Sequence, residues 1–190
     1  MFRDASGPLF EFLRSIGRPM DDCGHATPVA IFLRRQKIDE RWIIAHLNEI
    51  TETDFELLGR SPRFQIAHCP SSHIFFGHSP FALLRLQKLG FNICLGTDSL
   101  ASNSSLSLFS EMRSLLREEP VSAREALEMA TINGARAIGQ SDALGGISAN
   151  RLADLVAIPA ESGNNPYDTV VAFEGKVRWM MVNGRVRSGE

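Results

Sequence analysis

The fold is decided by three short apolar runs, which read WIIAHL (residues 42–47), FQIAHC (64–69) and FNICLGTD (91–98). Each run is nearly continuous in apolar residues instead of alternating with polar ones, which is typical of strands buried on both faces of a parallel sheet. The second run stops at Pro70, and the third is entered through Gly90. These runs therefore predict three parallel strands.

Amphipathic stretches separate and follow the strand-like runs. Apolar residues recur at helical spacing in residues 81–89 and again in 106–116. Ser122 and Glu125 form a capping-box pattern that predicts the start of a further helix, whose apolar face extends to Ala137. Strands that alternate with helices of this length predict βα units joined by right-handed crossovers.

The character of the sequence changes after residue 139. Short strand-like runs follow at residues 152–158, 169–173 and 177–182. A turn signal at 174–176 predicts a hairpin, Asn183-Gly184 is a second turn signal, and 161–166 reads as a plain loop. We therefore expect an α/β part over residues 1–139 and a small antiparallel unit over 140–190.

Composition is that of an ordinary globular domain. The 190 residues include 20 Lys+Arg and 22 Asp+Glu, for a net charge of −2, which argues against a nucleic-acid partner or a polybasic membrane surface. No apolar run approaches the roughly 18 residues needed to cross a bilayer, so we expect no membrane partner. Cys23, Cys69 and Cys94 form no CxxC pair and no even disulfide set, which favours buried, reduced thiols and a cytoplasmic location.

Polar side chains end all three predicted strands: His46, His68 and Asp98. The carboxyl ends of parallel strands are where ligands bind in α/β sheets and barrels. Asp98 is the strongest signal, because a carboxylate directly after a buried run needs a partner such as a divalent metal. It could also accept a proton from water bound to that metal. The alternative is that Asp98 caps a helix beginning near residues 102–106.

The two histidines each have a functional and a structural interpretation. His46 suits a metal ligand, a general acid or base, or a partner for a developing oxyanion, and the alternative is a hydrogen-bonded structural residue. Glu49 follows it in a His-x-x-Glu pattern. His68 precedes Cys69-Pro70, where the chain turns sharply, and we favour a structural role in which it orients that loop through a backbone hydrogen bond.

Several blocks of the chain resemble a known family. They are IAHCPSS (66–72), LGTDSLASN (95–103), FSEMR (109–113), MATINGA (129–135) and the stretch 144–156. They resemble the metal-dependent amidohydrolase superfamily, in the branch of chlorohydrolases and of S-adenosylhomocysteine/methylthioadenosine, guanine and aminodeoxyfutalosine deaminases. His73 departs from this pattern, because these proteins commonly have Asn there, and the substrate subgroup stays open.

The resemblance implies a TIM-like barrel with a small β-sandwich, and hydrolysis of a C–N bond in a nucleobase-like or nucleoside substrate with release of ammonia. Hydrolytic dechlorination and cyclic amide hydrolysis are alternative reactions. In this family one divalent metal, zinc or alternatively iron, is held by a His-x-His on strand 1, a His on strand 5 and an Asp on strand 8. Asp98 matches the strand-8 ligand, and counting back places His68 on strand 7 and His46 on strand 6. The implied catalytic residues are His46 and Asp98, and Glu49 becomes an accidental neighbour.

Length conflicts with a complete barrel, which needs about 200 to 250 residues. We therefore interpret the fold class as α/β, the C-terminal part of a TIM-like barrel (strands 6–8) followed by strands of a small β-sandwich. The chain would belong to a longer enzyme with a small heterocyclic substrate, and the isolated chain would be inactive for want of metal ligands. The alternatives are an interaction module that docks on a separate N-terminal half, or a truncated product that aggregates through its open sheet edges. Whether it forms a homo-oligomer is left open.

Overall fold

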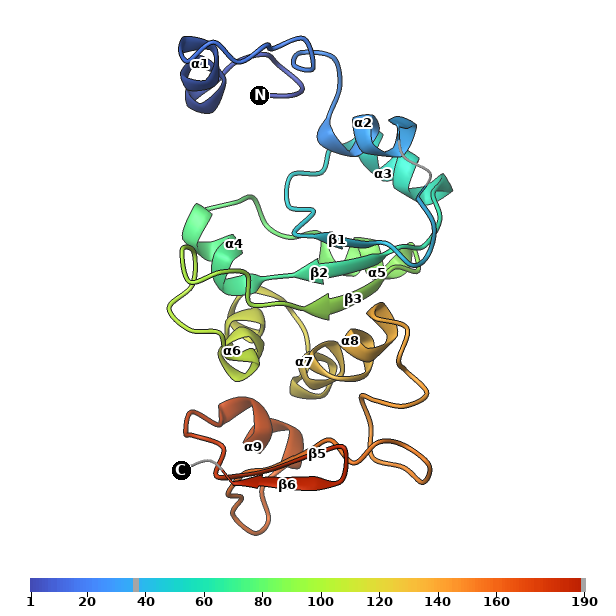
Figure 1. Cartoon of the computed structure of the whole chain (residues 1–190), viewed down its shortest axis with the longest axis vertical. Coiled ribbons are helices and arrows are strands. Elements are labelled where there is room, and N and C mark those ends of the chain that lie inside the picture. The colour runs from blue at the N-terminus through green and yellow to red at the C-terminus, as the bar shows by residue number, and fades with distance from the viewer. Residues whose placement is uncertain (36–37, 189–190) are drawn as a thin grey trace. The chain divides into compact units, whose positions relative to one another are not determined.

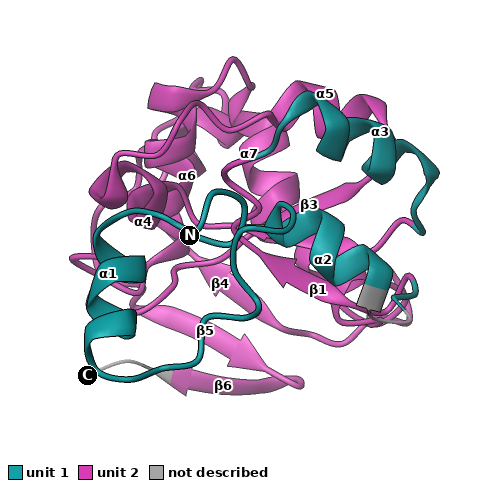
Figure 2. Ribbon diagram, turned by 90° about the horizontal axis from the view of Figure 1, so that it is seen from above, with its two compact units in different colours: residues 1–39, 50–62 teal, residues 40–49, 63–190 magenta. Residues whose placement is uncertain are grey.

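The computed structural model describes residues 1–35 and 38–188 (Figure 1). The chain divides into two compact units (Figure 2): unit 1 is residues 1–39 and 50–62, and unit 2 is residues 40–49 and 63–190. All the strands described below belong to unit 2. The domain boundary predicted after residue 139 stays a prediction.

Unit 1 contains helices that no sequence pattern predicted. They are α1 (Pro8–Ser15), α2 (Pro28–Arg35) and α3 (Glu52–Arg60). Helix α3 begins with a capping box, in which the Thr51 side chain accepts from the Asp54 N–H and the Asp54 carboxylate accepts from the Thr51 N–H. The buried Asp54 also accepts a hydrogen bond from the Thr27 hydroxyl, just before α2. This carboxylate therefore joins the starts of α2 and α3.

The predicted parallel sheet is confirmed. Its strands are β1 (Ile43–Ala45), β2 (Gln65–His68) and β3 (Asn92–Leu95). They are parallel in the order β1-β2-β3, so that Ile44, Ile66 and Ile93 lie side by side across the sheet. The carboxyl ends of all three strands therefore meet at one edge, as the sequence pattern required.

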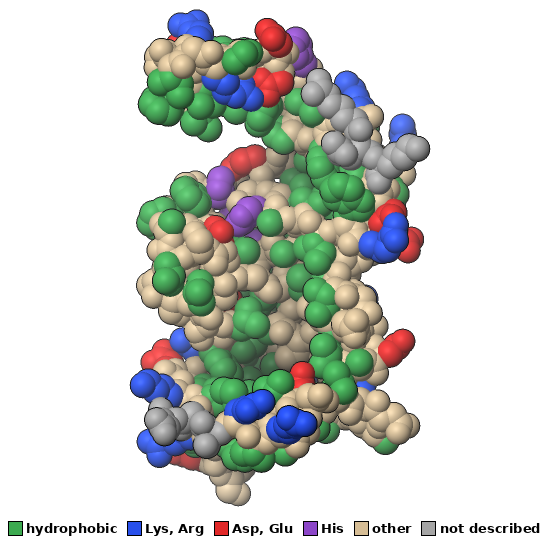
Figure 3. All heavy atoms as spheres, viewed as in Figure 1, with side chains coloured by type: hydrophobic (Ala, Val, Ile, Leu, Met, Phe, Trp, Pro, Cys, Tyr) green, Lys and Arg blue, Asp and Glu red, His purple; other side chains and the backbone are tan. Residues whose placement is uncertain are grey.

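The prediction that each strand is buried on both faces is correct for β2 and β3 but wrong for β1. Ile66 is fully buried and Ile93 is 2% exposed, whereas Ile43 is 46% exposed and Trp42 is 38% exposed. The physical reason is packing: β1 and β3 are both edge strands among the described residues, but helices from residues 83–137 pack against β3, whereas β1 packs mainly against β2. Apolar side chains reach the surface at many places on the face shown in Figure 3.

Helices α4 (Pro70–Phe76), α5 (Leu83–Lys88) and α6 (Leu108–Glu118) follow β2 and β3. Helices α5 and α6 occupy the two stretches that were predicted to be helical. Helix α5 ends as expected, because Gly90 has a φ of 88° and its N–H donates to the Gln87 carbonyl. Helix α4 was expected only as a sharp turn.

The helix predicted from Ser122 is interrupted. The capping box of Ser122 and Glu125 is confirmed, but α7 (Ala123–Ala130) ends at Thr131 and α8 (Ile132–Ala137) is separate. Thr131 has φ −125° and ψ −89°, and its hydroxyl donates back to the Leu127 carbonyl at 2.6 Å. After this break Asn133 Nδ2 donates to the Ile93 carbonyl of β3 at 3.0 Å, so the bend joins α8 to the sheet.

The C-terminal part contains the predicted antiparallel unit, with two corrections. The strands are β4 (Leu155–Ala157), β5 (Trp179–Val182) and β6 (Arg185–Ser188), in the order β4-β5-β6. The run 169–173 is not a strand but part of helix α9 (Pro166–Ala172). The helix begins within residues 161–166, which were predicted to be a plain loop. It starts there because the Asn165 side chain accepts a hydrogen bond from the Tyr167 N–H and Pro166 occupies the first helical position.

The second correction concerns the hairpin. The turn between β5 and β6 lies at Asn183-Gly184 and not at 174–176. Both turn residues have positive φ, 49° for Asn183 and 72° for Gly184, which is the backbone that two-residue hairpin turns require. None of the helices in the described part of the chain combines the length and apolar character needed to span a bilayer.

Candidate active site at the carboxyl ends of the parallel strands

The structure brings two of the predicted site residues together. His46 directly follows β1, Asp98 lies shortly after β3, and their side chains meet with 3.9 Å between His46 Nε2 and Asp98 Oδ2. Both side chains are partly open to solvent, at 38% and 29% exposed. The pair is too far apart for a direct hydrogen bond but close enough for an electrostatic interaction, which solvent weakens.

Two buried serine hydroxyls hold the Asp98 carboxylate. Ser72 Oγ donates to Asp98 Oδ2 at 2.7 Å, and Ser102 Oγ donates to the same oxygen at 2.8 Å. The hydrogen bond from Ser72, followed by that from Ser102, lowers the pKa of Asp98 below its ordinary value. Asp98 is therefore an anion at neutral pH. Sequence patterns missed both serines, because each is an ordinary hydroxyl residue in a loop or helix start.

The alternative in which Asp98 caps the following helix is wrong. That helix, α6, begins at Leu108 after Ser107, and the Asp98 carboxylate binds Ser72 and Ser102 instead. Asp98 itself has a φ of 55°, in the left-handed region that is uncommon for residues other than glycine. Strain of this kind is often found where a side chain must point in a fixed direction.

A buried glutamate holds the loop that carries Asp98. Glu111 of α6 is fully buried, and its carboxylate accepts from the Ser71 N–H at 2.9 Å and from Asn103 Nδ2 at 2.5 Å. The same amide group of Asn103 donates to the Thr97 carbonyl at 2.7 Å. Glu111 thus ties the loop that carries Asp98 to the start of α4, a role that no sequence pattern indicated.

His46 lies on an unusual backbone. His46 and Leu47 both have positive φ, 68° and 54°, and the His46 N–H donates to the Ala67 carbonyl of β2 at 2.9 Å. The hydrogen bond continues the ladder between β1 and β2 by one residue. The left-handed turn then directs the chain away from the sheet, and the imidazole lies beside Asp98.

His68, the third strand-end residue, is buried in apolar surroundings. Its ring stacks on Phe81, with 3.9 Å between ring centroids and 5° between planes. Burial, followed by the neighbouring His73, lowers the pKa of His68 to about 3, so the ring is neutral. The expected backbone hydrogen bond is not made at Nδ1, which has no hydrogen-bond partner among the described residues.

Cys69 and Cys94 are buried, free thiols, as expected from their sequence context, and Cys23 is also buried and free. Burial, followed by the charge of Asp98, raises the pKa of Cys69 to about 11. Burial also raises the pKa of Cys94. Cys69 packs closely against β3, since a Cβ placed on Gly96 would lie 3.1 Å from Cys69 Sγ. Because their raised pKa keeps Cys69 and Cys94 protonated at neutral pH, these two thiols are poor nucleophiles.

The described residues do not form a complete metal centre. Among them there is no group of three or more His, Cys, Asp or Glu side chains placed to hold a metal ion. Asp98 and His46 form a pair, whereas catalytic zinc takes about three protein ligands. The donors present therefore fit part of a metal site at most.

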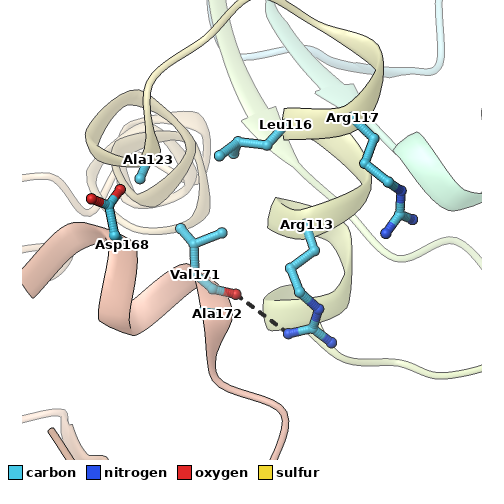
Figure 4. A pocket seen from close by; sticks show the side chains of 7 residues that line it. All are labelled: Arg113, Leu116, Arg117, Ala123, Asp168, Val171 and Ala172. Atoms are coloured by element: carbon cyan, nitrogen blue, oxygen red, sulfur yellow. Dashed lines mark hydrogen bonds between the residues drawn. The ribbon is translucent and has the colours of Figure 1, made fainter. Parts of the chain in front are cut away.

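A separate cavity of about 400 Å³ lies between α6, α7 and α9 (Figure 4). Its wall is largely apolar, with Arg113, Arg117 and Asp168 at the margins. Arg113 is engaged in the fold, because its Nη1 donates to the Phe173 carbonyl at 2.6 Å at the end of α9. None of the residues that form this cavity belongs to the His46–Asp98 pair.

Known proteins match this chain over most of its length. The family model described as "Amidohydrolase family" matches residues 17–187. A 5-methylthioadenosine/S-adenosylhomocysteine deaminase of Moorella thermoacetica is 31% identical over 176 residues, which covers 85% of this chain but 41% of that protein. The chain thus spans about two fifths of this curated relative.

Solved structures also match most of this chain with only part of their own length. An adenosine deaminase from Xanthomonas campestris with bound zinc is 25% identical, with a TM-score of 0.71 over 93% of this chain and 42% of the other. The aminofutalosine deaminase of Helicobacter pylori is 25% identical, with a TM-score of 0.66 over 77% of this chain and 38% of the other. In both cases this chain corresponds to less than half of its neighbour.

Proposed function

Because this chain belongs to the amidohydrolase family, we propose that it forms the C-terminal part of a metal-dependent hydrolase that acts on a C–N bond of a small heterocyclic substrate. The predicted resemblance to this family and its deaminase branch is confirmed. The reaction that we favour is deamination of a nucleobase-like or nucleoside substrate, with release of ammonia. The observation that carries the proposal is the approach of His46 and Asp98, 3.9 Å apart, at the carboxyl edge of a parallel sheet.

In this proposal β1, β2 and β3 are strands 6, 7 and 8 of a TIM-like barrel. The parallel order β1-β2-β3 and the likeness to the zinc-bound adenosine deaminase support it. The exposed edge of β1 would pair with the preceding barrel strand, which would bury Trp42 and Ile43. The antiparallel strands β4 to β6 would belong to the small β-sandwich.

Asp98 and His46 would have different tasks. Asp98 would be this chain's one ligand to a divalent metal, zinc or alternatively iron, and the other ligands would come from the remainder of the enzyme. Such a metal supplies Lewis-acid polarisation when it is bound. The Asp98 carboxylate, kept ionised by Ser72 and Ser102, is suited to accept the proton of the attacking water. His46 would stabilise charge on the attacked or departing group.

The isolated chain would then have no significant turnover, since two donor side chains do not hold a catalytic metal. This part of the proposal is compatible with an interaction module that docks on a separate N-terminal half. Both arrangements require the same second half, and they differ only in whether one gene encodes both.

The test compares the 190-residue chain with a complete enzyme, built by restoring the upstream coding sequence or by co-expressing the missing half. Bound metal is measured by mass spectrometry, and ammonia release is measured with methylthioadenosine and adenosine. We expect metal and activity in the complete enzyme, and loss of both in Asp98→Asn. Asp142→Asn, in an exposed loop, is the matched control.

Two results would contradict the proposal. Stoichiometric metal and turnover in the isolated chain would remove the claim that it is an incomplete part. Full activity of both Asp98→Asn and His46→Ala in the complete enzyme would remove the assigned site.

A further inference from the structure

The Glu49 side chain makes hydrogen bonds that its His-x-x-Glu sequence pattern does not suggest. Its carboxylate does not point at a reacting group: Oε1 accepts from His78 Nδ1 at 3.1 Å and from the Ser79 N–H at 3.2 Å, and Oε2 accepts from the Ser79 hydroxyl at 3.2 Å. All three donors lie in the loop between α4 and α5. Glu49 therefore joins the loop after β1 to the loop after α4.

The residue before it makes a second connection between the same parts. Asn48 Oδ1 accepts from Nδ1 of His73, a buried residue of α4, at 3.0 Å. Asn48 and Glu49 thus accept four hydrogen bonds that hold the segment immediately following His46 and Leu47. We call this set of contacts the loop latch.

Helix α4 links the latch to Asp98. Ser72 and His73 are consecutive residues of α4: Ser72 donates to the Asp98 carboxylate on one side, and His73 donates to Asn48 on the other. One short helix is therefore bound to both loops that carry the candidate catalytic side chains. Helix α4 therefore connects the Asp98 loop with the segment that follows His46.

The backbone at His46 is left-handed, a conformation that the contacts after it are placed to hold. Two successive non-glycine residues with positive φ, His46 and Leu47, adopt a conformation that the chain avoids unless its surroundings enforce it. The His46 N–H is fixed to β2, but the next residues leave the sheet. The latch fixes the far end of this strained segment.

We propose that Asn48 and Glu49 are positioning residues that hold the His46 imidazole beside Asp98 by latching the loop after β1 onto α4 and the loop that follows it. This inference rests on the proposed function for its relevance to catalysis, although the latch itself is a property of the chain. It is compatible with the expectation that Glu49 is not the proton-transferring glutamate of a His-x-x-Glu motif, and it gives Glu49 a positioning role instead.

The test uses the imidazole signals of the 190-residue chain labelled with ¹⁵N-histidine. The chain has five histidines, so each ring can be assigned with single substitutions. In Glu49→Ala we expect the His46 ring signal to shift and broaden, together with that of His78. The ring signal of His68, which is stacked on Phe81, should stay in place. A general loss of structure would move all the signals, so His68 separates positioning from unfolding.

Controls and outcomes follow from the same contacts. Glu161→Ala makes the same chemical change in an exposed loop and should leave His46 unchanged. If His78 shifts in Glu49→Ala while His46 does not, the proposal is overturned. If Glu49→Ala fails to fold, Ser79→Ala removes one hydroxyl contact and provides the second test: a smaller shift of His46 supports the proposal, and no shift overturns it.

Activity separates this inference from the proposed function. In the complete enzyme we expect Glu49→Ala to lower kcat by about tenfold or more with little change in KM, since a displaced catalytic group loses orientation. An active His46→Ala enzyme would refute the role of His46 whatever the spectra show. Unchanged spectra in Glu49→Ala would refute the latch whatever the activity is.

Discussion

The two halves of the candidate site are held in different ways. Asp98 is bound by buried groups, with Ser72 at 1% and Ser102 at 4% exposure and the fully buried Glu111 behind them. The loop that follows His46 is held mostly by groups near the surface, where the Glu49 side chain is 61% exposed and the His78 side chain is 32% exposed, although Asn48 in this loop also contacts the buried His73. One half of the site is therefore part of the core, and the other half is a loop whose stability is local.

The strands that carry the two halves of the candidate site differ in burial in the same way. Strand β2 lies between its two neighbours and β3 is covered by helices α5 to α8, whereas β1 packs mainly against β2 and leaves its side chains partly in water. A residue that is rigid through packing tolerates few changes, whereas a residue that is held by a few hydrogen bonds can be displaced without unfolding the protein. This difference can be measured by matched substitutions in the two halves.

The largest effect is expected from the core. Ile66→Ala in β2 removes a fully buried side chain and should lower the free energy of unfolding by about 3 to 4 kcal/mol. Ile43→Ala in β1, whose side chain is 46% exposed, should lower it by less than about 1 kcal/mol. Urea denaturation of both variants tests the contrast, and equal losses would show that β1 is as buried as β2.

A slightly smaller effect is expected at Glu111. Glu111→Ala leaves the Ser71 N–H and the Asn103 amide without their buried acceptor, which should cost about 3 kcal/mol. Glu118→Ala is the matched control, because it lies on the same helix with an exposed side chain. Thermal or urea unfolding gives the difference, and a loss below about 1 kcal/mol would mean that Glu111 does not support the Asp98 half.

The pH dependence of stability should report on His68. Its pKa is lowered to about 3 in the folded chain from the ordinary value of 6.5, so the unfolded chain binds the extra proton first. Between these values stability therefore falls as the pH falls, and above pH 6.5 this contribution is constant. His68→Gln should flatten the curve between pH 7 and pH 5, and His25→Gln, at an exposed site, should not. An unchanged slope in His68→Gln would show that His68 is not buried neutral.

The smallest effect on stability is expected at Glu49. Because its side chain is largely exposed, Glu49→Ala should change the free energy of unfolding by less than about 1 kcal/mol, even though it releases the loop latch. Denaturation of this variant beside Glu111→Ala compares the two halves of the site directly. A loss at Glu49 as large as the loss at Glu111 would remove the distinction between them.

Sequence patterns predicted those elements of the fold that are determined by residues close together in the sequence. Continuous apolar runs identified the three parallel strands, and the Ser122–Glu125 pair identified the start of α7. Helix α9 was missed because its β-branched residues Val170 and Val171 suggest a strand, while the cap at Asn165 and Pro166 that decides the matter lies before them. Capping chemistry outweighed side-chain preference at that position.

The site was predictable only in its strand-end residues. His46 and Asp98 stand out because polar groups rarely finish an apolar run. Their supports do not stand out, since Ser72 meets Asp98 across 26 residues and Ser71 meets Glu111 across 40 residues. A serine or glutamate acquires such a role from a tertiary contact, and no local pattern records it.

The close contact between Gly96 and Cys69 restricts how this sequence can change over time. A methyl group on residue 96 would lie 3.1 Å from the Cys69 sulfur, at the base of the segment that leads to Asp98. Alanine at 96 would require the Cys69 sulfur to shift by a few tenths of an ångström, so the effect of this substitution should depend on the residue at position 69. The two positions are therefore expected to covary, and Gly96→Ala should cost less in a Cys69→Ala background than in the present sequence.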